Sequence, residues 1–335
     1  MGLTDFRPFV RLSVNGQPLS DFLFSRLSSV RVTDTAGFMS DTVEIIFANT
    51  EALDRIEMPA PGAEIEVSLG YLGDFKHMGI YIADEVEEAS PPRAITIVGR
   101  AKAQGETDSG FAPIHQQKTR SWPAGMTLKA IAQTIAGENG LKAGVTEAAG
   151  AIVPGHIDQI DESDLSVLTR IALVHDLIAK PTGGMLFVGR RADAIKATGA
   201  PTPTVTIRES EVTRWAMRRS LSDVVGTIIA TYRDIETGKD TEVKVGSKEP
   251  VRRLRQRFRS EEEARAAADA ESRRSGRAKE TFEIELPGNP NIAAEGTVLP
   301  RGFSSAASGK WIVDTASHEV TEAGFRTTSQ MNRPE

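Results

Sequence analysis

Four neighbouring carboxylates in the first third of the chain are the side chains best suited by type to acid–base chemistry. Paired carboxylates hydrolyse glycosidic bonds, one as general acid and the other as base or nucleophile. The four residues are Asp84, Glu85, Glu87 and Glu88. Alternation along a strand would place neighbours on opposite faces of a sheet, which favours a solvated strand edge over a catalytic pair. Glu162 and Asp164 suggest the same chemistry, but we expect them at the start of a helix, where the helix dipole favours acidic residues.

Two short motifs are similar to ligand-binding signatures without matching them. Residues 302–310 (GFSSAASGK) resemble a phosphate-binding loop, but six residues instead of four separate the glycines, and Trp311 replaces the Ser or Thr that would bind magnesium. His318 and Glu319 begin like a zinc-protease signature, but Glu322 stands in place of the second histidine. The histidines lie at positions 77, 115, 156, 175 and 318 without ligand spacing, and the chain has no cysteine. We therefore expect no catalytic residue, no metal and no cofactor.

The densest charge feature is a run of arginines between residues 252 and 259. Its members are Arg252, Arg253, Arg255, Arg257 and Arg259. They could contact a polyanion, form a solvated strand balanced by the glutamates at 261–263, or, with Leu254 and Phe258 among them, form a protein interface. Because 40 Lys and Arg stand against 46 Asp and Glu, giving a formal net charge of −6, we favour the last two interpretations over nucleic acid.

Short strands must carry most of these residues. Apolar side chains alternate with polar ones at residues 10–14, 30–32, 43–47, 65–69, 80–86 and 95–98. Strands spaced by about 8–12 residues are typical of an antiparallel barrel or sandwich. The alternation returns after Pro201 and Pro203. It predicts strands at 205–207, 215–217, 224–232, 282–286 and 311–320.

Helical patterns interrupt the strands in two places. Thr127 can cap a helix with Leu128, Ile131 and Ile135 on one face, and a second helix is predicted to start within residues 161–164. Residues 185–189 read as a strand, so this middle stretch is a small α/β unit. Further on, Ser260 with a glutamate three residues later forms a capping box for a helix over about 260–275.

The chain has 335 residues, enough for about two or three domains. Hydrophobic residues at 39% and charged residues at 26% are typical of a soluble globular protein, and no run of about 18 apolar residues predicts a membrane span. We expect an α+β, mainly β fold: a β region at 1–104, an α/β insertion at 105–200, and a second β region at 201–335 that contains the predicted helix. The two β regions that flank the insertion could be distant structural duplicates.

One segment resembles a known family. Residues 155–172 (GHIDQIDESDLSVLTRIA) resemble the Q-x-x-E-S-D-L-x-x-L-x-R-L-A stretch of the late-control D family, the baseplate hub proteins of contractile-tailed phages, which is related to the hub-like portion of type VI secretion spike proteins. The matching residues are Gln159, Glu162, Ser163, Asp164, Leu165, Leu168 and Arg170. Shorter stretches agree in the same order, at residues 40–42, 62–71, 121–122, 286–288, 311–318 and 324–325.

The resemblance implies a structural protein of the virion tail baseplate, assembled in the cytoplasm of the bacterial host. Each β region would be a tube-like antiparallel barrel, and a homotrimer would present six barrels in a pseudo-sixfold ring. That ring would match the hexameric tail tube protein on one side and a separate trimeric spike protein on the other, among other baseplate proteins. DNA or the tape-measure protein would pass through the channel only in transit. The resemblance brings no catalytic residue, so no enzyme activity and no membrane insertion are expected.

Two other hypotheses remain open from the sequence. A tail-associated cell-wall hydrolase could use the paired carboxylates, with Glu85, Glu87, Glu162 and Asp164 as the candidates. A nucleic-acid adaptor could instead use the arginine run at 252–259.

Overall fold

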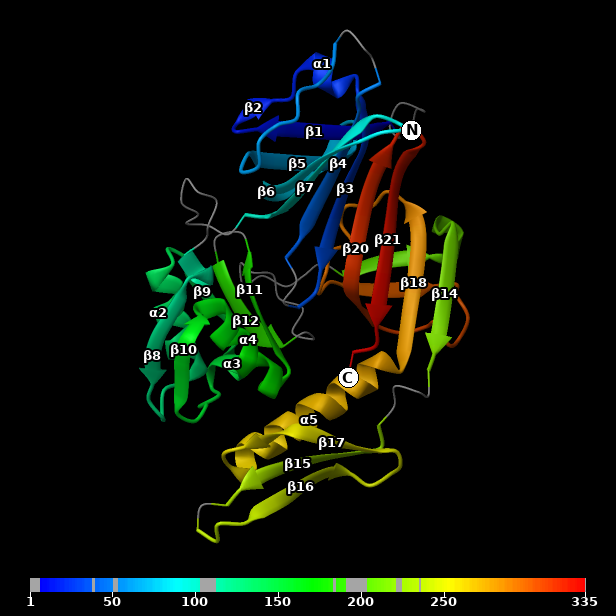
Figure 1. The fold of residues 1–335 in the computed structure, drawn as a ribbon. Coiled ribbons are helices and arrows are strands. Elements are labelled where there is room, and N and C mark those ends of the chain that lie inside the picture. Colours follow the sequence, from blue (N-terminus) through cyan, green and yellow to red (C-terminus); the bar gives the residue numbers. More distant parts are fainter. Residues whose placement is uncertain are drawn as a thin grey trace.

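The computed structural model confirms that the chain is mainly β (Figure 1). It describes residues 7–37, 40–50, 54–102, 113–182, 185–190, 204–220, 225–234 and 236–334. Four hydrophobic cores are distinguishable, and we name the parts of the chain after them. They are the N-terminal β unit (7–102), the α/β unit (113–190), the insertion (225–278) and the C-terminal β unit (204–220 with 279–334).

The N-terminal β unit contains the six strands that the alternating pattern predicts, together with β2 and α1, which it does not predict. Its elements are β1 (Pro8–Val14), β2 (Gln17–Pro18), α1 (Asp21–Phe24), β3 (Leu27–Thr35), β4 (Thr42–Ala48), β5 (Glu64–Tyr71), β6 (Asp74–Ala89) and β7 (Ala94–Ala101). Because successive side chains in a strand point to opposite faces, Val30, Val32, Val43 and Ile45 all enter one core. The polar residues between them face the other side of the sheet.

The α/β unit contains three capped helices and short strands. Its elements are η2 (Pro113–His115), β8 (Gln117–Trp122), α2 (Leu128–Glu138), β9 (Lys142–Val145), α3 (Glu147–Gly150), β10 (Ile157–Ser163), α4 (Asp164–His175), β11 (Leu177–Thr182) and β12 (Met185–Arg190). The Thr127 hydroxyl accepts the Ala130 amide at 3.2 Å, which confirms the predicted start of α2. The second helix begins at Asp164, within the predicted range, because residues 161–163 continue strand β10 and Ser163 is the cap of α4.

The C-terminal β unit surrounds an aromatic core and carries the insertion between two of its strands. Its elements are β13 (Thr204–Arg208), η4 (Glu209–Glu211), β14 (Arg214–Arg219), β18 (Glu280–Pro287), β19 (Thr297–Arg301), β20 (Trp311–Thr321) and β21 (Gly324–Asn332). The insertion adds β15 (Thr227–Arg233), β16 (Asp240–Gly246), β17 (Val251–Phe258) and α5 (Glu261–Ala278). Ser260 caps α5 as predicted, but the Glu263 carboxylate reaches the amide of Arg259 instead of completing the box at Ser260.

The two β units are joined into one continuous sheet. Strand β3 of the N-terminal β unit pairs antiparallel with β20 of the C-terminal β unit, and Figure 1 shows the two side by side. The sheet has 13 strands, and its main path runs β14-β18-β21-β20-β3-β4-β7-β6-β5-β1-β2. Among the described strands no pairing closes this path into a barrel. The expectation of a mainly β fold holds, and the sequence did not indicate that the two β regions share a sheet.

The two β units repeat one strand plan. The N-terminal order is β3-β4-β7-β6-β5-β1 and the C-terminal order is β14-β18-β21-β20-β19-β13. With the two-residue strand β2 left aside, strands of equal rank in the chain occupy equal places. Neighbours are antiparallel in both units, except that β13 and β19 are parallel where β1 and β5 are antiparallel. Even the register shift recurs: it falls between Ala83 and Glu85 in β6 and between Val313 and Thr315 in β20. The units are therefore structural duplicates.

Candidate functional site

The junction between the two β units is a seven-residue ladder from Ser29 opposite Thr321 to Thr35 opposite Thr315. We call this pairing of β3 with β20 the internal seam. On its polar face, Arg31 lies opposite Glu319 and the two form an ion pair at 2.6 Å. Next to them the hydroxyls of Thr33 and Ser317 are 3.4 Å apart. The seam is thus held by backbone pairing and by side chains that face each other directly.

A band of alternating charge crosses the internal seam on this polar face. It runs over five strands as Glu44, Arg31, Glu319, Arg326 and Glu285, with successive N–O distances of 3.1, 2.6, 2.6 and 3.3 Å. Partial burial alone would raise the pKa of Glu319, but hydrogen bonds from Arg326 and Arg31 hold it below its ordinary value. Glu319, the carboxylate in the middle of the band, therefore stays charged between two cations.

Apolar side chains close the seam from the opposite face. Val30 and Val32 of β3 are fully buried, and Phe325 of β21 packs into the core of the N-terminal β unit. His318 is also completely buried there. Its Nδ1 lies 2.9 Å from the Thr327 hydroxyl and its Nε2 lies 3.0 Å from the Ile292 carbonyl oxygen, which fits a neutral ring that accepts from Thr327 and donates to Ile292. This histidine is a core residue, as the sequence suggests.

A lysine ties the α/β unit to the end of the same seam. The Lys180 ammonium donates to the Thr35 carbonyl at 2.9 Å and to the Asp41 carboxylate at 2.5 Å, and lies 3.9 Å from Asp34. Burial, followed by repulsion from Asp34, raises the pKa of Asp41 to about 6 in spite of Lys180. The sequence reasoning missed this contact because Asp41 and Lys180 belong to units that are far apart in the chain.

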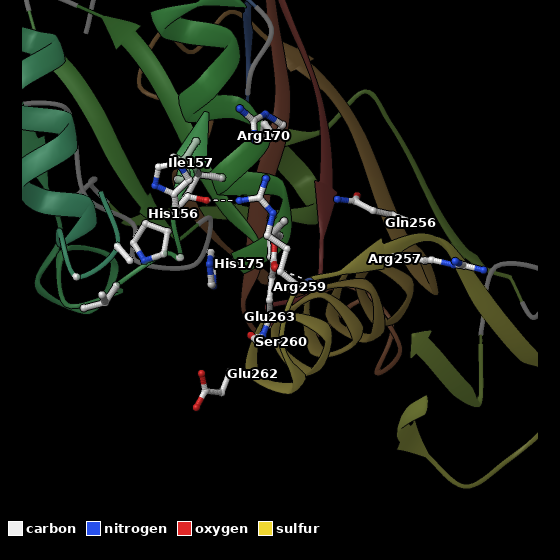
Figure 2. Close-up of a pocket in the computed structure, with 17 residues that line it drawn as sticks. His156, Ile157, Arg170, His175, Gln256, Arg257, Arg259, Ser260, Glu262 and Glu263 are labelled. Carbon is white, nitrogen blue, oxygen red and sulfur yellow. Dashed lines mark hydrogen bonds between the residues drawn. The ribbon is translucent and has the colours of Figure 1, made fainter. Parts of the chain in front are cut away.

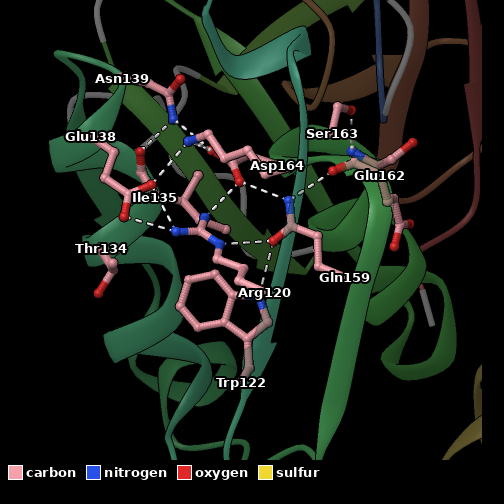
Figure 3. Close-up of polar contacts among 12 residues, drawn as sticks. Arg120, Trp122, Thr134, Ile135, Glu138, Asn139, Gln159, Glu162, Ser163 and Asp164 are labelled. Carbon is pink, nitrogen blue, oxygen red and sulfur yellow. Dashed lines mark hydrogen bonds and ion pairs between the residues drawn. The ribbon is translucent and has the colours of Figure 1, made fainter.

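The family-motif residues build the inside of the α/β unit (Figure 3). The Asp164 side chain is fully buried and accepts from Arg120 at 2.6 Å, from Lys118 at 2.6 Å and from the amides of Asn139 and Gln159 at 3.0 Å. The Gln159 oxygen in turn accepts from Trp122 Nε1 at 3.1 Å. Burial would raise the pKa of Asp164, but the hydrogen bonds from Gln159 and Lys118 hold it below its ordinary value.

The other motif residues act locally. Ser163 caps α4, Leu168 is buried in the core of the α/β unit with Leu165 packed against it, and Arg170 pairs with Glu162 at 2.7 Å. The predicted place at a helix start is wrong for Glu162, which lies in strand β10. It is confirmed for Asp164, which is the first residue of α4 and also the centre of a buried network. The motif residues therefore stabilise the fold of the α/β unit.

The candidate catalytic carboxylates do not form a catalytic pair. Asp84 forms an ion pair with Arg100 at 2.9 Å, and Glu88 lies 3.5 Å from Arg93. A general acid needs a raised pKa, whereas the pKa of Asp164 is lowered. Glu85 and Glu87 lie on exposed strand and form no ion pair with any residue in the described ranges. Nor does that part of the chain contain a cluster of His, Asp or Glu suited to a metal.

The arginine run forms strand β17 on the surface of the insertion. Arg252 pairs with Glu271 of α5 at 2.6 Å, Arg253 pairs with Glu242 and Arg257 lies 3.2 Å from Asp240, both acids being on β16. Arg259 donates to the His156 carbonyl of the α/β unit. Three of the five arginines are thus paired with acids of the chain, which supports the interpretation as a balanced strand. The partners are Glu271, Glu242 and Asp240, and not the glutamates at 261–263 that the sequence suggested.

A cleft of about 500 Å³ lies where the α/β unit meets the insertion (Figure 2). His156, Arg170 and His175 line it from the α/β unit, and Arg259 with Glu263 lines it from the insertion. Burial lowers the pKa of His175. Arg259 of the insertion donates to the His156 carbonyl of the α/β unit in this cleft, so the cleft is a junction between units.

The sequence is similar to phage baseplate hub proteins. A relative from Escherichia phage 186 described as "Probable baseplate hub protein" is 25% identical over 97% of this chain and 92% of its own length. A second relative with the same description, from Escherichia phage P2, is 29% identical over 61% of this chain and 51% of its own length. No protein-family model matches the chain. The resemblance to hub proteins inferred from residues 155–172 is confirmed by these relatives.

Solved structures share the fold over nearly the whole chain. The 43 kDa tail protein of prophage MuSo2 from Shewanella oneidensis has a TM-score of 0.69 at 17% identity, covering 98% of both chains. A tail protein from Neisseria meningitidis MC58 has a TM-score of 0.70 at 13% identity over 98% of this chain and 97% of its own. A component of the E. coli type VI secretion system has a TM-score of 0.59 at 9% identity, over 97% and 77%. In the described residues, no helix combines the length and apolar character needed to cross a membrane.

Proposed function

We propose that this chain is the baseplate hub of a contractile phage-like tail, where it acts as a structural adaptor and not as an enzyme. Three copies would form a ring in which each contributes two tube-like barrels, its N-terminal and C-terminal β units. The ring would have threefold symmetry by chain and pseudo-sixfold symmetry by barrel. One side of it would match the hexameric tail tube protein and the other a trimeric spike protein.

The observation that carries the proposal is the duplicated strand plan joined by the internal seam. A subunit that contains two equivalent units already joined edge to edge holds one third of a six-unit ring. Heterologous contacts that repeat the same edge-to-edge geometry generate a ring when the rotation closes. The similarity to two proteins named as baseplate hub proteins supports a location of such a ring in the tail baseplate of a virion.

The contacts of the carboxylates support a non-enzymatic role. The acidic residues that could have served a cell-wall hydrolase are ion-paired, buried in a structural network or placed on an exposed strand edge. DNA or the tape-measure protein would pass the ring only in transit. Peptidoglycan zymography of the purified chain should accordingly show no clearing, and clearing that is lost in Glu85→Ala or Glu162→Ala would contradict this part of the proposal.

The direct test is the mass and outline of the purified chain. Mass photometry over a wide concentration range, with and without the spike protein, should give three times the chain mass of 36.2 kDa. Negative-stain images of that species should show a threefold ring with six lobes. A particle that stays monomeric under all these conditions would overturn the proposal.

A further inference from the structure

The duplicated strand plan leaves one edge of each β unit without its counterpart partner. In the plan, β3 corresponds to β14 and β20 corresponds to β6. Inside the chain, β3 of the N-terminal β unit pairs with β20 of the C-terminal β unit. The complementary pair, β14 with β6, is not formed within the chain. Whatever completes the repeated geometry must bring a β14 and a β6 together from two different copies.

Both of these edges are available among the described residues. Strand β14 pairs with β18 on one side and ends the sheet on the other. The first half of β6 lies between β5 and β7, but from Glu85 to Ala89 it pairs only with β7. The corresponding part of β20 follows its register shift and runs from Thr315 to Thr321. This is the part that pairs with β3. The free half of β6 is therefore the structural counterpart of the half of β20 that forms the internal seam.

Stepwise alignment through the shared neighbours fixes the register. Val32 faces Val43 of β4, and Met217 faces Phe282 of β18. Val32 and Met217 therefore hold equivalent places in the two units, and the next residues, Thr33 and Arg218, are counterparts. On the other strand, Glu85 follows the register shift as Thr315 does, so Glu87 is the counterpart of Ser317. Thr33 and Ser317 lie directly opposite each other in the internal seam. The same geometry between two copies would place Arg218 opposite Glu87.

We propose that β14 of one copy pairs antiparallel with residues 85–89 of β6 of the next copy, with Arg218 opposite Glu87. This intermolecular seam rests on the proposed ring and assigns the residues that close it. It is heterologous, since each copy offers β14 at one end and β6 at the other. Three such contacts and three internal seams would alternate around the ring.

Charge complementarity supports the choice of a second copy as the occupant of both edges. The outward face of β14 carries Arg214 and Arg218, which form no ion pair with any described residue. The outward face of the free half of β6 carries Glu85 and Glu87, which are likewise unpaired in the described ranges. Opposite charges directly across two strands stabilise their pairing, and the band of alternating charge at the internal seam shows the same device.

Disulfide trapping can test the register, because the chain has no cysteine of its own. Glu87→Cys with Arg218→Cys should give covalent dimers and trimers on oxidation, since directly opposed Cα atoms lie within the range of about 4.4–6.8 Å that a disulfide spans. Thr33→Cys with Ser317→Cys is the matched internal control and should cross-link within one chain. Glu87→Cys with Arg214→Cys is the register control. It should remain unlinked, because four residues of strand separate the two sites by about 13 Å.

The outcomes separate this inference from the proposed function. Suppose that the particle is trimeric and that the internal control forms its disulfide. If the Glu87→Cys and Arg218→Cys pair then fails to cross-link, or if Glu87→Cys links equally well to Arg214→Cys, the proposed seam is wrong while the ring stands. If no trimer forms under any condition, both proposals fail. Hydrogen exchange on the unmodified trimer gives a measurement that needs no variant: amides in 85–89 and 215–219 should be slower than in dissociated chains, and equal rates would overturn the seam.

Charge reversal provides an independent test of the pairing between β14 and β6. Glu87→Lys or Arg218→Glu should each weaken the trimer by roughly fivefold per seam, since like charges would face each other across the strands. The double reversal should restore assembly. Single variants that assemble as well as the unmodified chain would contradict the pairing.

Discussion

At the scale of single residues, the polar groups with the most contacts stabilise the chain from inside. Asp164 has no exposed side-chain surface, yet two cations and two amides surround its carboxylate. Removing one partner of a buried, hydrogen-bonded charge is costly because the remaining charges lose their compensation. A protein that works as a scaffold can use such a network to fix one geometry for the unit that contains it.

Asp164→Asn should lower the free energy of unfolding by about 2–4 kcal/mol at neutral pH, measured by urea denaturation. Glu138→Gln is the control, since Glu138 pairs with the same Lys118 and Arg120 but is half exposed, and should cost less than about 1 kcal/mol. The lowered pKa of Asp164 means that its contribution is present above the ordinary value of 3.8 and is lost as pH falls below it. Equal effects of the two variants would contradict this account.

His318 should make the chain less stable as the pH falls. Burial lowers its pKa from 6.5 to about 4, so below pH 6.5 the unfolded chain binds a proton that the folded chain does not. The loss should develop between pH 6.5 and 4, reach roughly 3 kcal/mol and then level off. The measurement is the difference in unfolding free energy between the unmodified chain and His318→Gln at each pH. This difference separates the effect of His318 from that of Asp41, whose raised pKa makes the folded chain more stable as the pH falls. A difference that does not change with pH would contradict the prediction.

At the scale of elements, the sequence identified the types of the long elements and missed their partners. Period-two alternation predicted β1, β3, β4 and β5 because one face of each strand is buried. The short strands β8 to β11 were missed because their sequences, QKTRSW in β8 for example, do not alternate apolar and polar residues. The internal seam was out of reach, since Arg31 and Glu319 are 288 positions apart and no local pattern records their pairing.

The end of α4 provides a test of how the insertion is attached. Asp176 terminates α4 in a left-handed conformation at φ 57°, and its carboxylate accepts from Arg277 of α5 at 2.5 and 2.8 Å and from Arg273 at 3.2 Å. Burial would raise its pKa, but the bonds from Arg277 keep it lowered, so the group is charged at neutral pH.

Asp176→Asn should loosen the contact between α4 and α5 without disturbing the turn, because asparagine tolerates the left-handed conformation. Amide hydrogen exchange in the last turn of α5 should become about ten- to a hundredfold faster, as expected for the loss of a partly buried pair. Glu261→Gln, which removes a surface pair with Arg265 at the other end of α5, should leave that turn unchanged. Unaltered exchange in Asp176→Asn would show that packing alone holds the helix.

At the scale of the whole molecule, the insertion lies outside the duplicated plan. In the N-terminal β unit a short connection joins β3 to β4, whereas residues 220–279 join the corresponding strands β14 and β18. The chain nevertheless leaves and re-enters the sheet at one place, since Arg219 lies opposite Glu280 and the Ser220 amide donates to the Lys279 carbonyl at 2.9 Å. The insertion also has a core of its own. The ring surfaces should therefore be independent of it.

Replacing residues 221–278 by a short Gly-containing turn should leave the continuous sheet folded and the trimer intact, because β14 and β18 already meet as neighbours at Arg219 and Glu280. Far-ultraviolet circular dichroism and the fluorescence of buried Trp311 report folding, and mass photometry should give three times the shortened chain mass. Adding Arg218→Glu to the shortened chain should weaken the trimer as it does in the full chain. If the shortened chain folds but stays monomeric, the insertion must take part in the contacts between copies. The edges of β14 and β6 would then not be sufficient to close the ring.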